Sequence, residues 1–438
     1  MNSKSGLKTF IIIWMGQLIS SIGSGLTSFG LNVYVFEKTE SAMACSLVTL
    51  CAFFPMVFLT PISGVLADKF SRAKLMLIGD FFSAIFLGVM LVMISMGIDN
   101  VPVICICVFL SAIFSSLLDP AYKAAVTDLL TVDEFAKAGG LVQLASSAKY
   151  LISPILAGLI FQFSGIYLIL IIDICTFFST LFTVLYAKKI MEASQKIKDS
   201  SVHFIKDISE GFKELTQSKG IVVLLVLSIV ITFYIGIIET MLKPMLLELT
   251  DSSTIGLITS ISSVGMLISS LFLGVKGIRK GYLKALSLSF LFMGITIALV
   301  GCTENLIAIC IVGFMFFSMI PVTNVSLDVL MRCNISRDTQ GRAWGLISFV
   351  SQIGYIIAYA VSGVLADYVF NPLLYDDGAL ANTVGKVVGT GSERGIALML
   401  VICGISMLIV SPFLKCGKNM KQMEANCFSL LESYQQEF

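Results

Sequence analysis

The sequence predicts an all-α membrane protein with twelve transmembrane helices in two pseudo-symmetric six-helix bundles. Three observations support this fold class: the composition, the length of the apolar runs, and the side on which the basic residues fall. Of the 438 residues, 57% are hydrophobic and 13% are charged, and the mean hydropathy is +0.94. A soluble domain carries about 25% charged residues, so this chain has too few to cover a soluble surface. We expect a lipid bilayer around it.

The same composition excludes two other classes of protein. A disordered chain combines low hydrophobicity with high charge, which is the opposite of this composition. The net charge of +1 provides no basic excess to neutralise phosphates, so we expect no nucleic-acid partner.

The apolar runs have the length of membrane spans, since a helix needs about 20 such residues to cross a bilayer. They lie at roughly 10–36, 42–66, 74–97, 101–122, 138–163, 166–187, 221–247, 255–276, 282–302, 305–331, 342–368 and 394–414. The first run is longer than the core of a signal peptide, which has about 7–15 residues. We therefore expect it to be retained as a span.

Lysine and arginine predict the orientation, because cytosolic loops carry an excess of both. With the N-terminus in the cytosol, 24 of these residues fall on the cytosolic side and four on the opposite side. This asymmetry predicts cytosolic termini for a multi-pass protein of a bacterial cell membrane.

A charged central stretch divides the chain. We expect an N-terminal bundle over 1–190, a cytosolic linker over 191–219, and a C-terminal bundle with a short tail over 220–438. Apolar residues at helical spacing within 200–217 predict an amphipathic helix at the membrane surface.

A short internal repeat supports two homologous halves. Gly140–Leu141 is followed 18 residues later by Gly158–Leu159, and Gly345–Leu346 is followed 18 residues later by Gly363–Val364. Repeated halves are common in secondary transporters.

The cysteines and the single histidine give no sign of a metal site or cofactor. The eleven cysteines form no C-x-x-C pair, and His203 has no metal-ligand companion nearby. We expect the cysteines to pack as small apolar residues between helices.

The loop after the second span, GVLADKFSRAKLM at 64–76, resembles the G-x-L-a-D-r-x-G-r-k signature of the major facilitator superfamily. We expect Gly64 to allow the close approach of a neighbouring helix. Asp68 would face a helix N-terminus or an arginine, and Arg72 would hold the loop at the cytosolic face. The resemblance implies a transporter, expected to be monomeric, in which two bundles rock around a central cavity.

The fifth span is similar to a glycine pattern of proton-driven drug exporters, G-x8-G-x3-G-P-x2-G-G. The corresponding positions are Gly140, Lys149, Ser153, Pro154, Ala157 and Gly158. Small residues allow close helix packing and a proline kinks a span, while Lys149 departs from the pattern. Stretches such as IWMGQLISSIGSGL at 13–26 and DPAYKAAVTDLL at 119–130 resemble the macrolide-efflux branch. This resemblance implies export of a small drug-like molecule with the proton as coupling ion.

Charges inside the spans are candidate functional residues, because each costs about 2.5–3.5 kcal/mol on insertion scales. Lys149 lies roughly 16 Å into its span, so we expect it to line the cavity and to be neutralised by a carboxylate. The resemblance places Asp80 and Asp173 on spans outside the cavity, where hydroxyl groups such as that of Thr176 would satisfy them. The candidate proton carriers are, in order, Glu239, Asp119 and Glu37.

Two pairs have the i,i+4 spacing of helical ion pairs at the inner ends of spans 4 and 10. They are Asp119–Lys123 and Asp328–Arg332, which we expect to act as gate or structural pairs. Asn32 and Gln143 are candidate polar substrate contacts. The 32 phenylalanines and 20 methionines predict an apolar cavity suited to a hydrophobic or amphipathic compound.

Other functions remain open on the same fold. The chain could import or export an endogenous metabolite or a siderophore, or be a sensor that transports nothing. It contains no H-E-x-x-H, G-x-S-x-G or paired mid-membrane aspartates, so we do not expect an enzyme. The outer loop 369–393 is rich in glycine, and we expect it to be a flexible loop or lid.

Overall fold

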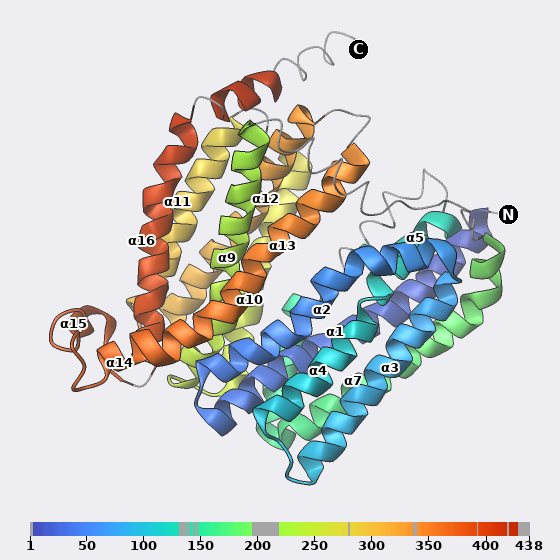
Figure 1. Ribbon diagram of the computed structural model, residues 1–438, viewed down its shortest axis with the longest axis horizontal. Helices are drawn as coiled ribbons and strands as arrows, with labels where there is room; N and C mark the ends of the chain where they lie inside the picture. The colour runs from blue at the N-terminus through green and yellow to red at the C-terminus, as the bar shows by residue number, and fades with distance from the viewer. Residues whose placement is uncertain are drawn as a thin grey trace. The chain divides into compact units, whose positions relative to one another are not determined.

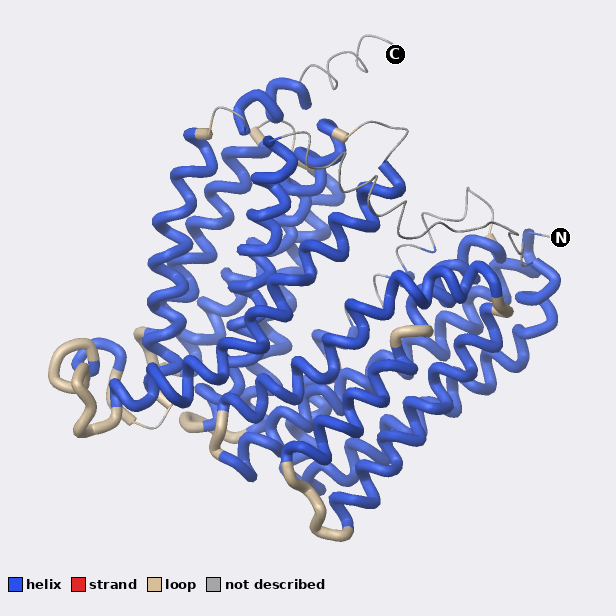
Figure 2. Tube along the Cα trace, in the orientation of Figure 1, coloured by secondary structure: helices blue, strands red, loops and turns tan. Residues whose placement is uncertain are grey.

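A computed structural model describes residues 3–130, 138, 141–142, 145, 148–194, 219–278, 281–335, 340–391, 393–417 and 420–427. Every regular element within these residues is a helix (Figure 2). Helices are expected in a bilayer, because each backbone N–H and C=O group must find its partner without water.

Eleven of the helical segments are long and apolar enough to cross a membrane. The longest of them, Ala148–Ala193, has 46 residues and is broken at Gly165, whose φ of 61° and ψ of −154° are not helical. The conformation with positive φ suits glycine, which has no Cβ. The segment therefore contains two spans, and the expected fold class with twelve helices is confirmed.

The chain divides into two compact units. Met1–Val202 and Thr250–Ser260 form the first unit, and His203–Leu249 and Ile261–Phe438 form the second. The boundary after Ser260 falls inside the helix Ser252–Lys276. Residues 250–260 of the second half of the sequence therefore belong to the first unit. The amphipathic helix expected at 200–217 lies outside the described residues.

Short capped turns connect the first helices of unit 1. Its helices are α1 (Ser3–Thr39), α2 (Ala42–Lys69), α3 (Arg72–Ser95), α4 (Val101–Ser115), α5 (Leu118–Leu129) and α7 (Ser153–Ser194). The side chains of Ser41, Ser71 and Asn100 accept hydrogen bonds from the backbone N–H three residues further on. Such N-caps satisfy donors that a helix leaves unpaired.

The second half contributes the remaining helices (Figure 1). They are α9 (Lys219–Leu247), α10 (Ser252–Lys276), α11 (Tyr282–Gly301), α12 (Leu306–Asn334), α13 (Gln340–Leu365), η2 (Ala366–Phe370), α14 (Asn371–Leu374), α15 (Gly385–Val388) and α16 (Arg394–Cys416). The outer loop 369–393 contains the end of η2 and the short helices α14 and α15, and its role as a flexible loop or lid stays a prediction. Asn371 donates a hydrogen bond to Glu393 over 3.2 Å, and Arg394 pairs with Glu304.

The two units repeat the same neighbour relationships. In unit 1, α1 and α3 both pack against α7, and α3 also packs against α4. In unit 2, α9 packs against α13, and α11 packs against both α16 and α12 (Figure 1). Counted as spans, pair 3–4 of the first half recurs as 9–10 of the second, and spans 1 and 3 both contact the helix that contains spans 5 and 6. This correspondence supports the internal repeat seen in the sequence.

Small residues bring the paired helices into backbone contact. A Cβ placed on Gly354 of α13 would lie 2.1 Å from the Ile229 carbonyl oxygen of α9, and one on Gly404 of α16 would lie 2.5 Å from the Gly294 carbonyl oxygen of α11. Because lipid is as apolar as leucine, close packing of small residues is a main source of helix association in membranes.

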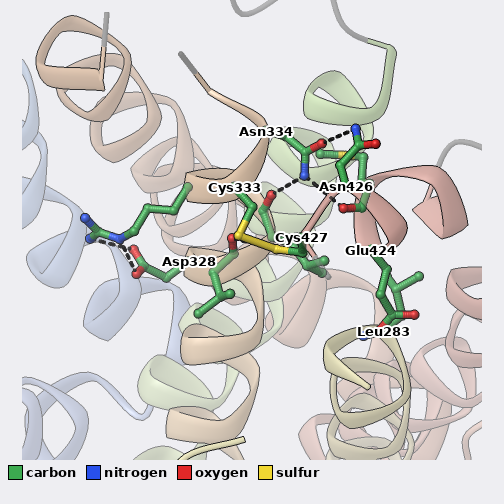
Figure 3. The surroundings of a disulfide bond; sticks show 11 residues. Leu283, Asp328, Cys333, Asn334, Glu424, Asn426 and Cys427 are labelled. Carbon is green, nitrogen blue, oxygen red and sulfur yellow. Dashed lines mark hydrogen bonds and ion pairs between the residues drawn. A yellow bond between two sulfur atoms is a disulfide. The ribbon is translucent and has the colours of Figure 1, made fainter. Parts of the chain in front are cut away.

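A disulfide joins Cys333, near the end of α12, to Cys427 in the helical segment 420–427 (Figure 3). Hydrogen bonds surround it: Asn334 donates to the Met423 carbonyl over 3.1 Å, and Asn426 donates to Asn334 over 3.0 Å. The expectation that all cysteines simply pack is wrong for this pair. The two residues are 94 positions apart, so only the tertiary structure brings them together.

We predict that Gly404→Ala destabilises the protein, because its methyl group meets backbone atoms that cannot move without separating α11 and α16. Overpacking of this kind costs about 1–3 kcal/mol. The matched control is Gly274→Ala, where no described atom lies within 4 Å of the added Cβ. Thermal unfolding of the two detergent-purified variants gives their melting temperatures. Equal melting temperatures for Gly404→Ala and Gly274→Ala would contradict the packing argument.

We also predict that denatured protein, purified without reductant, gains two alkylated cysteines after reduction. Mass spectrometry should assign both to peptides containing Cys333 and Cys427. The variant Cys427→Ser should lose this difference, whereas Cys302→Ser, which removes an exposed free thiol, should retain it. Full labelling of both cysteines before reduction would be inconsistent with the disulfide.

Candidate functional site

Arg72, at the start of α3, is a buried cation held by groups of two other helices, α2 and α5. Its guanidinium group pairs with the carboxylate of Asp128 on α5 and donates to the carbonyl oxygens of Ala124 at 3.2 Å and Ala67 at 3.4 Å. A buried cation needs both a counter-charge and further acceptors. Arg72 therefore ties the end of α2 and the start of α3 to α5.

The sequence predicted that Arg72 holds the loop 64–76 at the cytosolic face, but it did not identify the partner of Arg72. Asp128 was not singled out in the sequence, and only the packing of α5 against α3 identifies it as the partner. The close helix approach expected at Gly64 is not found, because no described atom lies within 4 Å of a Cβ at that position. The side chain of Asp68 lies outside the described part of the chain.

Both expected i,i+4 ion pairs are present. Lys123 Nζ lies 2.6 Å from Asp119 Oδ2, and Arg332 Nε lies 2.9 Å from Asp328 Oδ2. All four side chains are exposed, and exposed pairs contribute about 0–1 kcal/mol to stability. Their assignment to a gate stays a prediction.

The candidate polar residues near the other helix ends have local partners. Asn32 is buried, donates to the Ser28 carbonyl at 3.0 Å and lies 3.4 Å from the hydroxyl group of Thr49. Glu239 is exposed and accepts a hydrogen bond of 2.7 Å from Tyr359, which joins α9 to α13. Glu37 is exposed at the end of α1.

The proline and small residues of span 5 pack closely, as the glycine pattern predicted. Ser153 donates to the Ile22 carbonyl of α1 over 3.0 Å. Gly158 accepts a hydrogen bond of 3.3 Å from Ser252 at the start of α10, and a Cβ on Gly256 would lie 2.2 Å from the Pro154 carbonyl oxygen. These contacts all lie within unit 1. Gly140 and Gln143 are outside the described residues.

Lys149 lies against α1. A Cβ on Gly25 would be 3.0 Å from Lys149 Cγ, and a Cβ on Gly23 would be 2.7 Å from Asp173 Oδ1. The Lys149 side chain is half-buried. Its neutralisation by a carboxylate and its place in a cavity stay predictions.

Asp80 of α3 and Asp173 of α7 are buried, with exposed fractions of 6% and 7%. Thr176 Oγ1 lies 3.5 Å from Asp173 Oδ1, as expected from the sequence. Asp80 differs from the expectation, because its Oδ2 atom is buried without a hydrogen-bond partner in the described structure. The helices that carry the two aspartates, α3 and α7, pack against each other.

We predict that Arg72→Met lowers the stability strongly, since it leaves the Asp128 carboxylate uncompensated. Removing one member of a buried ion pair costs about 3–5 kcal/mol. The double variant Arg72→Met with Asp128→Leu should unfold at a higher temperature than Arg72→Met alone, because no charge is left unpaired. The control Lys74→Met removes an exposed cation two residues away. If the effects of Arg72→Met and Asp128→Leu on the unfolding temperature were additive, this would argue against an interaction between the two side chains.

Comparison with known proteins places this geometry in a family. The profile of the Major Facilitator Superfamily matches residues 13–242 and 224–381. Macrolide efflux protein A of Streptococcus pyogenes is 26% identical over 369 residues, which cover 82% of this chain and 89% of the relative. The protein of the same name from Enterococcus faecalis is 28% identical over 264 residues, covering 60% and 81%. Multidrug resistance protein 2 of Bacillus subtilis is 23% identical over 377 residues, covering 82% and 89%.

Solved structures show the same fold at low identity. The nucleoside transporter NupG superposes with a TM-score of 0.70 at 13% identity, covering 95% of this chain and all of the other. A bacterial homologue of the iron transporter ferroportin, in an inward-facing state, has a TM-score of 0.68 at 15% identity, covering 92% and 99%. With the matching profile, these findings identify the chain as a member of the Major Facilitator Superfamily of membrane transporters.

Proposed function

We propose that this transporter exports hydrophobic or amphipathic small molecules of the macrolide or drug-like kind. The observation that carries the proposal is the similarity to Macrolide efflux protein A, which extends over 82% of this chain and 89% of the relative. A match of that extent includes both halves of the fold rather than a shared motif. The name of that relative describes the relative, and the substrate class of this chain is our proposal.

The distribution of charge supports a substrate with an apolar body. Between Lys8 and Glu37, α1 contains no charged residue, and neither does α4. Helices of this composition offer apolar side chains with hydroxyl and amide groups between them, which suits compounds that are mainly hydrophobic. A sugar or anion would need paired charged groups to replace its water.

We further propose proton antiport with alternating access as the mechanism. Export against a gradient needs an energy source, and the fold contains pairs of repeated helices of the kind that rock in secondary transporters. Ionisable residues inside the spans supply groups that can bind and release a proton. In this scheme Lys149, Glu239, Asn32 and Gln143 contact the substrate or line its path.

The gate and coupling roles are assigned by position. Charged residues near helix ends lie where the bundles would open and close, so they can change partners when the bundles move. We assign these roles to Glu37, Asp68, Arg72, Asp119, Lys123, Asp328 and Arg332, and a conformational role to Gly64, Gly140, Pro154 and Gly158.

We predict that expressing the chain in a drug-sensitive bacterium lowers the steady-state accumulation of radiolabelled erythromycin or of ethidium. A protonophore should return accumulation to the level of cells carrying an empty vector, because it removes the driving force. Membrane levels of the protein are measured alongside. Unchanged accumulation of both probes would contradict drug export and favour a metabolite transporter or a sensor, and export that persists with the protonophore would contradict proton antiport.

A further inference from the structure

The helical segment 420–427 packs one face against the rest of unit 2. Met420, Met423 and Cys427 are buried, whereas Lys421 and Asn426 are exposed. Residues three and four positions apart share one face of a helix. The segment is therefore amphipathic, and its apolar face docks on unit 2.

This segment contacts the ends of α9, α11 and α12 (Figure 3). Glu424 Oε1 accepts a hydrogen bond of 2.9 Å from the backbone N–H of Leu283, in the first turn of α11. Asn334 at the end of α12 donates to the Met423 carbonyl oxygen over 3.1 Å. A Cβ on Gly220 of α9 would lie 2.8 Å from Met423 Cγ. The segment therefore holds together helix ends that lie on the same side of the unit.

The distribution of basic residues predicts that this side faces the cytosol. The chain near these helix ends contains Lys219, Lys284, Arg332 and Lys421, and cytosolic loops have an excess of lysine and arginine. The cytosol keeps thiols reduced, and the disulfides that form there are usually transient, catalytic or redox-sensing. We therefore expect the disulfide between Cys333 and Cys427 to form and break with the redox state of the cell.

The two sulfur atoms differ in their access to solvent. Cys333 is half-buried and Cys427 is fully buried, so a small thiol or disulfide from solution reaches the Cys333 sulfur first. Cys427 Sγ lies 3.6 Å from the Val329 carbonyl oxygen, which can accept a hydrogen bond from the thiol after reduction. Cys333 therefore has the exposure of a reacting cysteine, and Cys427 has the position of the resolving cysteine.

The hydrogen bonds around the disulfide do not involve the sulfur–sulfur bond. The two bonds described above and a third, from Asn426 to Asn334 over 3.0 Å, join amide, carboxylate and backbone groups. They hold the Cα atoms of Cys333 and Cys427 at 5.2 Å, a separation that a disulfide can span. The two thiols therefore stay close together after reduction, and the bond can form again without unfolding of the protein.

We propose that Cys333 and Cys427 are a redox modification site, a thiol–disulfide switch that fastens the helical segment 420–427 to α12. Oxidation begins when the Cys333 thiolate attacks a small disulfide and displaces one thiol. The Cys427 thiolate then attacks the Cys333 sulfur and displaces the second thiol. The two cysteines lose two electrons and two protons, and the small disulfide becomes two thiols. Reduction by small thiols reverses both steps.

The two redox forms differ in how firmly the segment is held. The disulfide links residues 94 positions apart, and such a link restricts the freedom of the open chain. In the reduced protein, hydrogen bonds and buried side chains alone hold the segment, so it can undock and expose its backbone to proteases. Oxidation therefore stabilises the cytosolic ends of α9, α11 and α12.

The first test measures the disulfide in growing bacteria that express the full-length protein. Cells are quenched with N-ethylmaleimide before a short treatment with the thiol oxidant diamide, directly after it, and after recovery. Trypsin then releases peptides 333–337 and 422–438, which stay joined when the disulfide is present. We expect the joined peptides to be scarce in growing cells, abundant after diamide and scarce again after recovery. An equal abundance at all three times, or no joined peptides at any of them, would overturn the proposal.

The second test measures the docking of the segment in the detergent-purified protein. The protein is treated with oxidised or reduced glutathione, and trypsin cleavage after the exposed Lys421 is timed. Cleavage should be about tenfold or more faster in the reduced form, because the segment must undock before it is cut, and the melting temperature should be lower. Equal cleavage rates in the two forms would overturn the proposal, and so would a disulfide that glutathione reduces only in denatured protein.

Two variants separate this disulfide from other effects of glutathione. Cys427→Ser should be cleaved after Lys421 at the rate of the reduced parent, whichever form of glutathione is present. Cys302→Ser, which removes an exposed free thiol, is the matched control and should respond as the parent does. A Cys427→Ser protein that still responds like the parent would overturn the proposal. If Cys427→Ser does not fold, the comparison of the oxidised and reduced parent decides, because it changes no residue.

Discussion

The absence of water in the bilayer is the constraint on which the rest of this structure depends. Each polar group within the spans must find a partner inside the protein, and an α-helix satisfies its backbone groups within a single segment. The side-chain hydroxyls follow the same rule. Thr232 donates to carbonyl groups of its own helix and to Ser351 on α13 at 2.6 Å. Thr240 lies within 3.1 Å of Ser362 on the same neighbour.

The same constraint explains why the helices associate through small residues. Burial of apolar surface gives little advantage when lipid is the alternative, so association depends on close contact and on hydrogen bonds between helices. Ser287 and Ser411 bond each other's backbone carbonyl between α11 and α16, and Gly294 and Gly404 bring the same two backbones together. In the first unit, glycines of α1 allow α7 to approach closely. The small residues at these helix contacts therefore affect both the stability of the protein and the freedom of its helices to move.

Charge inside such a protein is scarce, and each instance has a specific environment. The Arg72–Asp128 pair is compensated within itself and holds the turn between α2 and α3. Asp80 of α3 and Asp173 of α7 are also buried, and Asp80 Oδ2 has no hydrogen-bond partner among the described residues.

The sequence by itself determined the fold class, the number of spans and the superfamily. Hydropathy, span length and the signature at 64–76 are local properties, because a bilayer acts on each helix separately. It also predicted the i,i+4 pairs Asp119–Lys123 and Asp328–Arg332, whose partners lie one helical turn apart. The tertiary structure decided the contacts between residues distant in the chain, such as Arg72 with Asp128 and Cys333 with Cys427. Such partners depend on which helices pack together and at what depth, and those are properties of the whole bundle rather than of any one segment.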